Sequence, residues 1–378
     1  MEVYFDNAAT SRPYEEVIDE VAYAMKHYYG NPSSVHRLGV EAQSKLDYAK
    51  EKVAQMINAT KEEIIFTSGG SESNNFLLRA FLKPNCHIIT SSIEHLSILN
   101  STKALETQGI NVTYVEVDSK GRVQIEKLQE ALRKDTVLVS IMAVNNEIGT
   151  IEDMETIGHI VKNQGRAKFH VDAIQGYGKI DIDVKKNNID LLSASGHKIH
   201  GPRGIGLAYV RKGLMPTPFI YGGGQEKGKR AGTENVANAL GFAKACEIIK
   251  PNIKKNYDYV KSIKEYFIEG LNKIKEIKIN SPIEDEFSPY ILNVAFKGIR
   301  GEVLLHMLEE QGIYVSTISA CSSKNKKESY VLKAIGVSKE YMEGAIRFSF
   351  NETNTKEEVD YTLDILEKSL KFLRRIKI

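Results

Sequence analysis

The chain has 378 residues, of which 42% are apolar and 26% are charged, and its formal net charge is +2. This length allows one large domain and a smaller one, and the composition is that of an ordinary globular protein. The small net charge excludes broad electrostatic attraction to nucleic acid or to an anionic membrane.

Targeting signals and cysteines set the expected location. The segment MEVYFDNAATSRP lacks the basic residues and apolar run of a signal peptide, and no apolar stretch approaches the roughly 20 residues that cross a bilayer. The three cysteines, Cys86, Cys246 and Cys321, have no close-spaced partner, which argues against a disulfide framework and a CxxC-type zinc site. We expect a cytoplasmic protein with no metal site and no membrane attachment.

Short β-rich segments alternate with longer amphipathic segments between about residues 60 and 210. Ile and Val are frequent in the short segments, and Gly, Asn or Asp bound them. This alternation predicts an α/β domain with a mostly parallel seven-stranded sheet and helices on both faces. The predicted strands are 63–68, 87–92, 111–117, 136–144, 168–173, 189–195 and 205–210, and the helices between them include 73–82, 125–134 and 154–165.

The rest of the chain predicts a second, smaller unit. A long helical stretch at about 235–275 follows a glycine-rich segment, and a polar, proline-containing break covers 280–290. Two further strands, 290–296 and 344–350, indicate an α+β unit. We expect a large domain at residues 15–255 and a small domain formed by residues 1–14 and 256–378.

Lys198 stands between a predicted buried strand and a Gly/Pro turn, in SASGHKIHGPRG. A lysine at a strand end is usually solvated, but one beside His and Ser at the edge of a sheet can form a Schiff base with an aldehyde. Pyridoxal phosphate (PLP) is the cofactor that fits this chemistry. It needs a lysine, an acid for its ring nitrogen, an aromatic platform and a phosphate cradle.

Two other strand ends offer the acid and the platform. Asp172 lies at the end of an apolar strand, where its carboxylate could hold a pyridinium proton or cap the next helix. His95 follows another strand, where its imidazole could stack on the ring or serve only the local structure.

The remaining polar groups also follow strands. Gly70 and Ser71, in FTSGGSESNN, could bind phosphate at a helix start, although a Gly-Gly pair is also common in plain turns. Asn146 and Gln175 could hydrogen-bond the ring hydroxyl. Because parallel strands end at one edge of a sheet, five strands would deliver polar groups to the same place.

Cys321 lies in STISACSSKNKK, which predicts an exposed loop. An exposed cysteine near lysines should have a larger thiolate fraction, so Cys321 is a candidate nucleophile. Cys86 and Cys246 fall in apolar elements and are expected to be packing residues.

Ten motifs occur in a fixed order: YFDNAAT, NPSSVH, FTSGGSESNN, EH, NNEIG, HVDAIQ, SASGHKIHGPRG, GGGQEKGKRAGTEN, SACSS and RFSF. With them the chain resembles the cysteine desulfurases of the NifS/IscS type, within the class-V aminotransferase group of fold-type-I PLP enzymes. The resemblance implies conversion of L-cysteine to L-alanine, with transfer of the sulfur to Cys321 as a persulfide.

The resemblance also implies a role for each site residue. Lys198 would link to PLP and move the substrate's α-proton, Asp172 would pair with the ring nitrogen, and His95 would stack on the ring. Arg347 would bind the substrate carboxylate, next to Asn146. The cofactor contacts would come from Gly70, Ser71, His95, Asn146, Asp172, Gln175, Ser195, His197 and Lys198, with Thr233 reaching the neighbouring subunit's cofactor in an obligate homodimer.

Two departures from the family pattern concern backbone freedom. Ile318 replaces a glycine that often precedes the nucleophile, and a β-branched residue disfavours positive φ. Asn351 replaces a usual glycine after RFSF, and Asn tolerates left-handed geometry.

Several questions stay open at this point. The alternatives are a related PLP enzyme, such as a selenocysteine lyase or a small-substrate aminotransferase, and a non-enzymatic scaffold. The expected partner is a sulfur-acceptor protein, such as an iron–sulfur scaffold or a tRNA thiolation enzyme, without direct nucleic-acid contact. Cys321 is also a candidate ligand for an iron–sulfur cluster in transit.

Overall fold

The main sheet has the predicted seven strands. The computed structural model describes residues 1–317 and 328–376. The strand order is β2-β8-β7-β6-β5-β3-β4, in which β8 is antiparallel to both neighbours and the other pairs are parallel. The predicted fold class is therefore confirmed. The strands are β2 (Ile64–Thr67), β3 (His87–Ser91), β4 (Asn111–Val115), β5 (Thr136–Met142), β6 (Lys168–Asp172), β7 (Leu191–Ser195) and β8 (Gly206–Val210).

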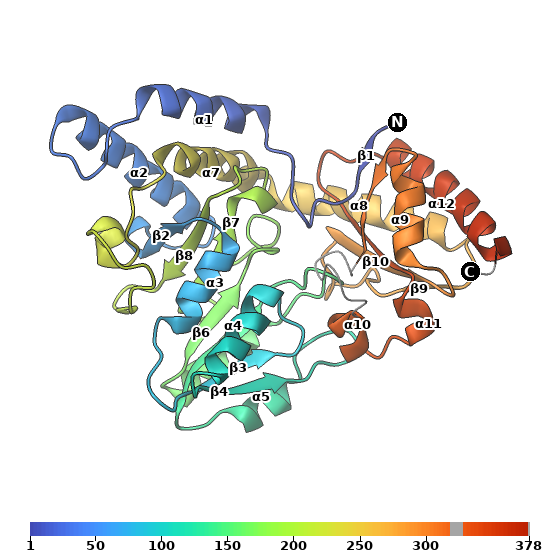
Figure 1. The fold of residues 1–378 in the computed structure, drawn as a ribbon, viewed down its shortest axis with the longest axis horizontal. Coiled ribbons are helices and arrows are strands. Elements are labelled where there is room, and N and C mark those ends of the chain that lie inside the picture. Colours follow the sequence, from blue (N-terminus) through green and yellow to red (C-terminus); the bar gives the residue numbers. More distant parts are fainter. Residues whose placement is uncertain (318–327, 377–378) are drawn as a thin grey trace.

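Helices cover both faces of this sheet (Figure 1). Successive strand residues point to opposite faces, and here they enter different apolar clusters. Ile88 packs in the cluster that includes residues of α3 (Gly70–Arg79) and α4 (Leu96–Glu106). Ile89 packs in the cluster of the other face. That cluster includes residues of α2 (Arg37–Gln55), α5 (Ile125–Ala131), α6 (Met154–Gln164) and α7 (Val236–Ile249).

The stretch predicted as helical over 235–275 is two helices. α7 ends at Ile249 and α8 covers Ile253–Leu271, with a 3-10 turn at Lys250–Asn252 between them. Pro251 explains the interruption, because proline lacks the N–H that would continue the hydrogen-bond ladder. α7 packs against α2 and against α1 (Glu15–His27), whereas α8 packs against α12 (Lys356–Ile376).

A second, antiparallel sheet has the order β12-β13-β10-β9. Its apolar cluster combines residues of α8 and α12 with Val3 and Phe5 from the N-terminus, and Figure 1 shows these elements gathered at the end of the molecule that holds both termini. The domain boundary at residue 255 stays a prediction. The remaining elements are β1 (Val3–Tyr4), β9 (Ile277–Ile279), β10 (Ile291–Phe296), α9 (Gly301–Glu309), β11 (Ile313–Tyr314), β12 (Ser316–Thr317), α10 (Tyr330–Ala334), α11 (Lys339–Met342) and β13 (Ala345–Ser349).

No helix in the described ranges is long and apolar enough to cross a membrane. Cys86 and Cys246 are both buried, as expected for packing residues.

A buried carboxyl group predicts how stability depends on pH. Both carboxyl oxygens of Glu152 accept the Val123 N–H, at 3.1 and 3.2 Å, and burial raises the pKa of Glu152 from 4.5 to about 8. Between these values the folded protein keeps a proton that the unfolded chain has lost. Stability should therefore fall as pH rises, by about 1.4 kcal/mol per pH unit.

The variant Glu152→Gln has no such proton to lose. Urea unfolding at pH 5 and pH 8 should show its free energy of unfolding increasing relative to that of the wild type. An equal difference in the free energy of unfolding at the two pH values would contradict the raised pKa of Glu152.

Candidate functional site

A cavity of about 1210 Å³ opens at the carboxyl ends of the main-sheet strands. Most of the predicted site residues line it. Thr233 does not line this cavity, and its side chain is exposed on the segment before α7. Ile318 and Cys321 lie outside the described residues. The predicted residues at the cavity are Gly70, Ser71, His95, Asn146, Asp172, Gln175, Ser195, His197, Lys198 and Arg347.

Lys198 ends a single 3-10 turn, Gly196–Lys198, that directly follows β7. Its Nζ donates to the carbonyl oxygens of Ala8 at 2.5 Å and Ala9 at 2.8 Å. The amine is therefore held at the cavity wall by the N-terminal segment, which lies about 190 positions away in the sequence.

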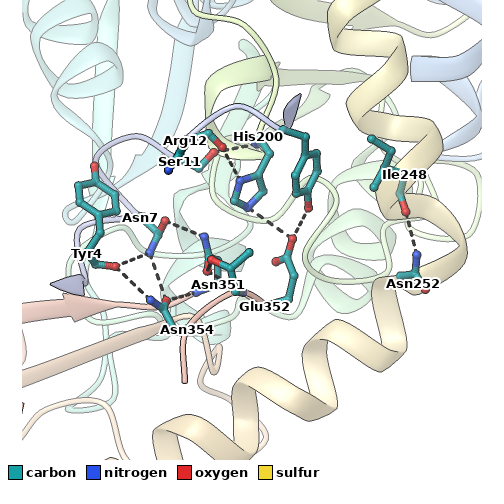
Figure 2. A network of polar contacts seen from close by, with 12 residues as sticks. Tyr4, Asn7, Ser11, Arg12, His200, Ile248, Asn252, Asn351, Glu352 and Asn354 are labelled. Atoms are coloured by element: carbon teal, nitrogen blue, oxygen red, sulfur yellow. Dashed lines mark hydrogen bonds and ion pairs between the residues drawn. The ribbon is translucent and has the colours of Figure 1, made fainter. Parts of the chain in front are cut away.

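The N-terminal segment is fixed to the second sheet by Asn7. Its Nδ2 donates to the Ser349 carbonyl oxygen at 3.0 Å. Its Nδ2 also donates to the Tyr4 carbonyl oxygen at 3.1 Å, and its Oδ1 accepts from Asn351 at 3.0 Å (Figure 2). Asn351 does not use the left-handed geometry that asparagine tolerates, because its φ is not positive. Its side chain instead ties the N-terminal segment in place.

His200 fixes the same segment from the other side. It has a φ of 59°, which is uncommon for a residue with a side chain. Its N–H donates to Ser11 Oγ at 2.7 Å, its Nδ1 lies 2.7 Å from the Arg12 carbonyl oxygen, and its ring stacks on Tyr14. Its Nε2 lies 3.5 Å from Glu352 (Figure 2). The N-terminal segment, whose carbonyls hold Lys198, is thus bound to Ser349 of the second sheet and to His200, which follows β7 of the main sheet.

Asp172 is the buried acid of the cavity. Its Oδ1 accepts the Ile174 N–H at 3.0 Å and its Oδ2 accepts Asn74 Nδ2 at 2.8 Å. Burial raises the pKa of Asp172, while nearby His95 and these hydrogen bonds lower it. A cationic partner at this carboxylate would favour its ionised form further.

His95 serves the local structure and also lines the cavity, where its ring could stack on a cofactor. It is the N-cap of α4, since its Nδ1 accepts the Ser97 N–H at 3.1 Å. Because Nδ1 is an acceptor, the neutral ring carries its proton on Nε2. Burial lowers the pKa of His95, which favours the neutral form of this ring at the cavity.

Four atoms of the cavity wall are buried and have no hydrogen-bond partner among the described residues: Asn146 Oδ1, Gln175 Oε1, Ser195 Oγ and Arg347 Nε. Buried polar atoms without partners are rare in folded proteins. The four therefore indicate a polar ligand that supplies both donors and acceptors. The wall is also tight at Gly70, where a Cβ atom would approach Ile174 Cδ1 to 2.2 Å.

Arg347 lies on β13 and faces the cavity with two of its nitrogens already engaged. Nη1 donates to the Asn146 carbonyl oxygen at 2.9 Å, and Nη2 donates to Asp6 Oδ1 at 3.0 Å. The same Asp6 oxygen accepts Ser316 Oγ at 2.8 Å. Asp6 was not predicted as a site residue, although the YFDNAAT motif contains it.

Residues 3–362 match the family model described as aminotransferase class-V. The chain belongs to this family. It is 43% identical over 380 residues to the cysteine desulfurase IscS of Dictyoglomus turgidum, covering 99% of this chain and 96% of the relative. A solved NifS-like protein superimposes with a TM-score of 0.93 at 41% identity, covering 99% of this chain and 100% of that one. SspA in complex with cysteine gives 0.82 at 34% identity, covering 92% and 98%.

The resemblance to class-V aminotransferases of the NifS/IscS type is therefore confirmed. Enzymes of this family use PLP as a general property. The cavity fits that cofactor, because the unpartnered Asn146, Gln175 and Ser195 oxygens lie beside a half-buried lysine and a buried aspartate. Membership supports a cysteine desulfurase and does not favour a selenocysteine lyase, a small-substrate aminotransferase or a scaffold.

Proposed function

We propose that this class-V enzyme is a PLP-dependent cysteine desulfurase in which Cys321 receives the sulfur of L-cysteine. The observation that carries the proposal is the set of unpartnered buried atoms around Lys198 and Asp172. These atoms define a polar site with the Lys198 amine at its wall and the buried Asp172 carboxylate at its base.

Different residues of the cavity would bind different parts of the cofactor. Ser71, Ser195 and His197, with the backbone at Gly70, would hold the phosphate at the start of α3. Asn146 and Gln175 would bind the ring's oxygen side. Asp172 would pair with the ring nitrogen while His95 covers one face. When bound, PLP supplies an aldehyde for the substrate amine and a sink for electrons released at Cα.

Two side chains would act on the substrate. Arg347 would bind the carboxylate through its free Nε edge, and its contacts to Asp6 and the Asn146 carbonyl orient that edge. Lys198 would take the α-proton and return it to the product. The Ala8 and Ala9 carbonyls hold its Nζ at the cavity wall, where the amine would link to PLP.

The sulfur step balances without an external oxidant. The Cys321 thiolate attacks the substrate sulfur, an S–S bond forms, and the C–S bond breaks. The products are a Cys321 persulfide and L-alanine, so one thiol and one cysteine give one persulfide and one alanine.

We further propose a homodimer that works in the cytoplasm. The exposed Thr233 would reach the partner's cofactor phosphate, and apolar side chains exposed on or near α1 and α2, including Tyr23, Met25, Tyr29 and Val40, would be covered by the second subunit. The sulfur would pass to an acceptor protein for iron–sulfur cluster assembly or tRNA thiolation.

Mass spectrometry of the purified protein tests this proposal. After incubation with L-cysteine and PLP, the peptide that contains Cys321 should carry one extra sulfur atom, and L-alanine should accumulate. Incubation with L-alanine in place of L-cysteine is the control. Alanine formation with the extra sulfur on a different cysteine would overturn the role of Cys321.

A further inference from the structure

Asn74 lies on α3, beneath the cavity, and joins two residues of the proposed cofactor site. Its Nδ2 donates to Asp172 Oδ2 at 2.8 Å and to Ser97 Oγ at 2.8 Å. Ser97 Oγ in turn lies 2.8 Å from His95 Nδ1. One amide therefore connects the buried acid with the imidazole that faces the ring position.

Only one orientation of the Asn74 side-chain amide fits its hydrogen-bond partners. Ser193 Oγ bonds Asn74 Oδ1, and an amide oxygen only accepts, so the Ser193 hydroxyl must donate. A flipped amide would place its oxygen against the Asp172 carboxylate, with no proton between them. Both N–H groups of Asn74 are thus committed to Asp172 and Ser97.

A buried chain behind Asn74 is compatible with this direction. His170 Nε2 lies 3.4 Å from Ser193 Oγ, and its Nδ1 lies 2.8 Å from Ser140 Oγ. Since the Ser193 proton points at Asn74, His170 must donate from Nε2 and accept from Ser140 at Nδ1. Asn74, Ser193, His170 and Ser140 are all fully buried, so water does not compete for these bonds.

We propose that Asn74 is a positioning residue for PLP, which holds the Asp172 carboxylate ionised and aligned with the ring nitrogen. This inference rests on the proposed function. Without the Asn74 donor, Asp172 would keep the Ile174 N–H alone on one oxygen, and burial would favour its neutral form. A neutral acid would no longer stabilise a protonated ring nitrogen.

The test compares Asn74→Leu with the wild type in two measurements that do not depend on turnover. The first is the PLP dissociation constant, which should rise roughly ten- to hundredfold, as expected for the loss of one bond to a charged group. The second is the ¹⁵N chemical shift of ring-labelled PLP in the holoenzyme. It should move toward that of an unprotonated pyridine.

Three further variants keep the result interpretable. Asn74→Ser, which is smaller and polar, should change both measurements in the same direction if the leucine variant does not fold. Ser97→Ala should change affinity less than about threefold, because the Ser97 backbone N–H still holds His95 and Asn74 still holds Asp172. Asn280→Leu removes another buried asparagine, bonded to Asn293, and should leave both measurements unchanged.

The outcomes separate the two proposals. A wild type that binds no PLP overturns the proposed function and this inference with it. If the wild type binds PLP and the Asn74 variants keep its affinity and its ¹⁵N shift, the inference alone is wrong. A loss of affinity equal in Asn74→Leu and Asn280→Leu would mean that Asn74 has only a general structural role.

Discussion

Replacing Cys321 with alanine should stop persulfide formation and lower the rate of alanine production by about 10³-fold or more, while PLP binding stays unchanged. The reason is that the C–S bond breaks only when a nucleophile takes the sulfur. Cys321 is not among the residues proposed to bind PLP. The measurements are persulfide detection by mass spectrometry, L-alanine production, and the visible absorbance of the bound cofactor.

Cys246→Ala is the matched control for this experiment. Cys246 is buried on α7, and burial raises the pKa of its thiol to about 12, so it is not a thiolate at pH 7. This variant should keep both products. If the Cys321 variant still released sulfide and alanine at the wild-type rate, the sulfur-acceptor role would have to be given up.

The main sheet could be predicted because its strands are short apolar runs buried on both faces. Leu191 and Leu192, for example, enter clusters on opposite faces, so a continuous apolar segment was the correct signal. The interruption near residue 250 was missed, although Pro251 marks it in the sequence. Helix periodicity continues on both sides of that proline, and it hid the break.

The site could be predicted where the sequence places a polar residue at the end of a predicted strand or shortly after it. Asp172 ends β6 and Lys198 follows β7, and both reach the cavity. Asn74 lies inside α3, and Asp6 follows β1, a two-residue strand that the sequence analysis does not predict. Asp6 meets Arg347 across 341 positions and Asn74 meets Asp172 across 98. Such contacts depend on tertiary packing, and no local pattern of one sequence encodes them.

Side chains that bind other side chains are therefore the hardest part of a site to predict. Asn74 stands inside FTSGGSESNN, whose glycines and serine predict a phosphate site. Asp6 stands inside YFDNAAT, which contributes to the family resemblance but predicts no contact by itself. An asparagine or aspartate inside such a motif indicates a residue that needs a polar partner, since an unpartnered amide or carboxylate would be costly to bury. It does not say which residue that partner is.

Replacing Lys198 with alanine should lower alanine production by about 10⁴-fold or more, because the variant lacks the amine that moves the α-proton. The fold should survive, since Lys198 is half-buried at the wall of an open cavity, outside the apolar clusters of the core. A small primary amine such as methylamine, added to the variant, should restore part of the rate by entering the space left by the side chain.

Lys179→Met is the matched control. Lys179 is a more deeply buried lysine, whose burial lowers its pKa to about 8, but it does not line the large cavity. If the Lys179 variant lost turnover while the Lys198 variant kept it, the reactive amine would be Lys179, and the assignment of chemistry to the end of β7 would be wrong.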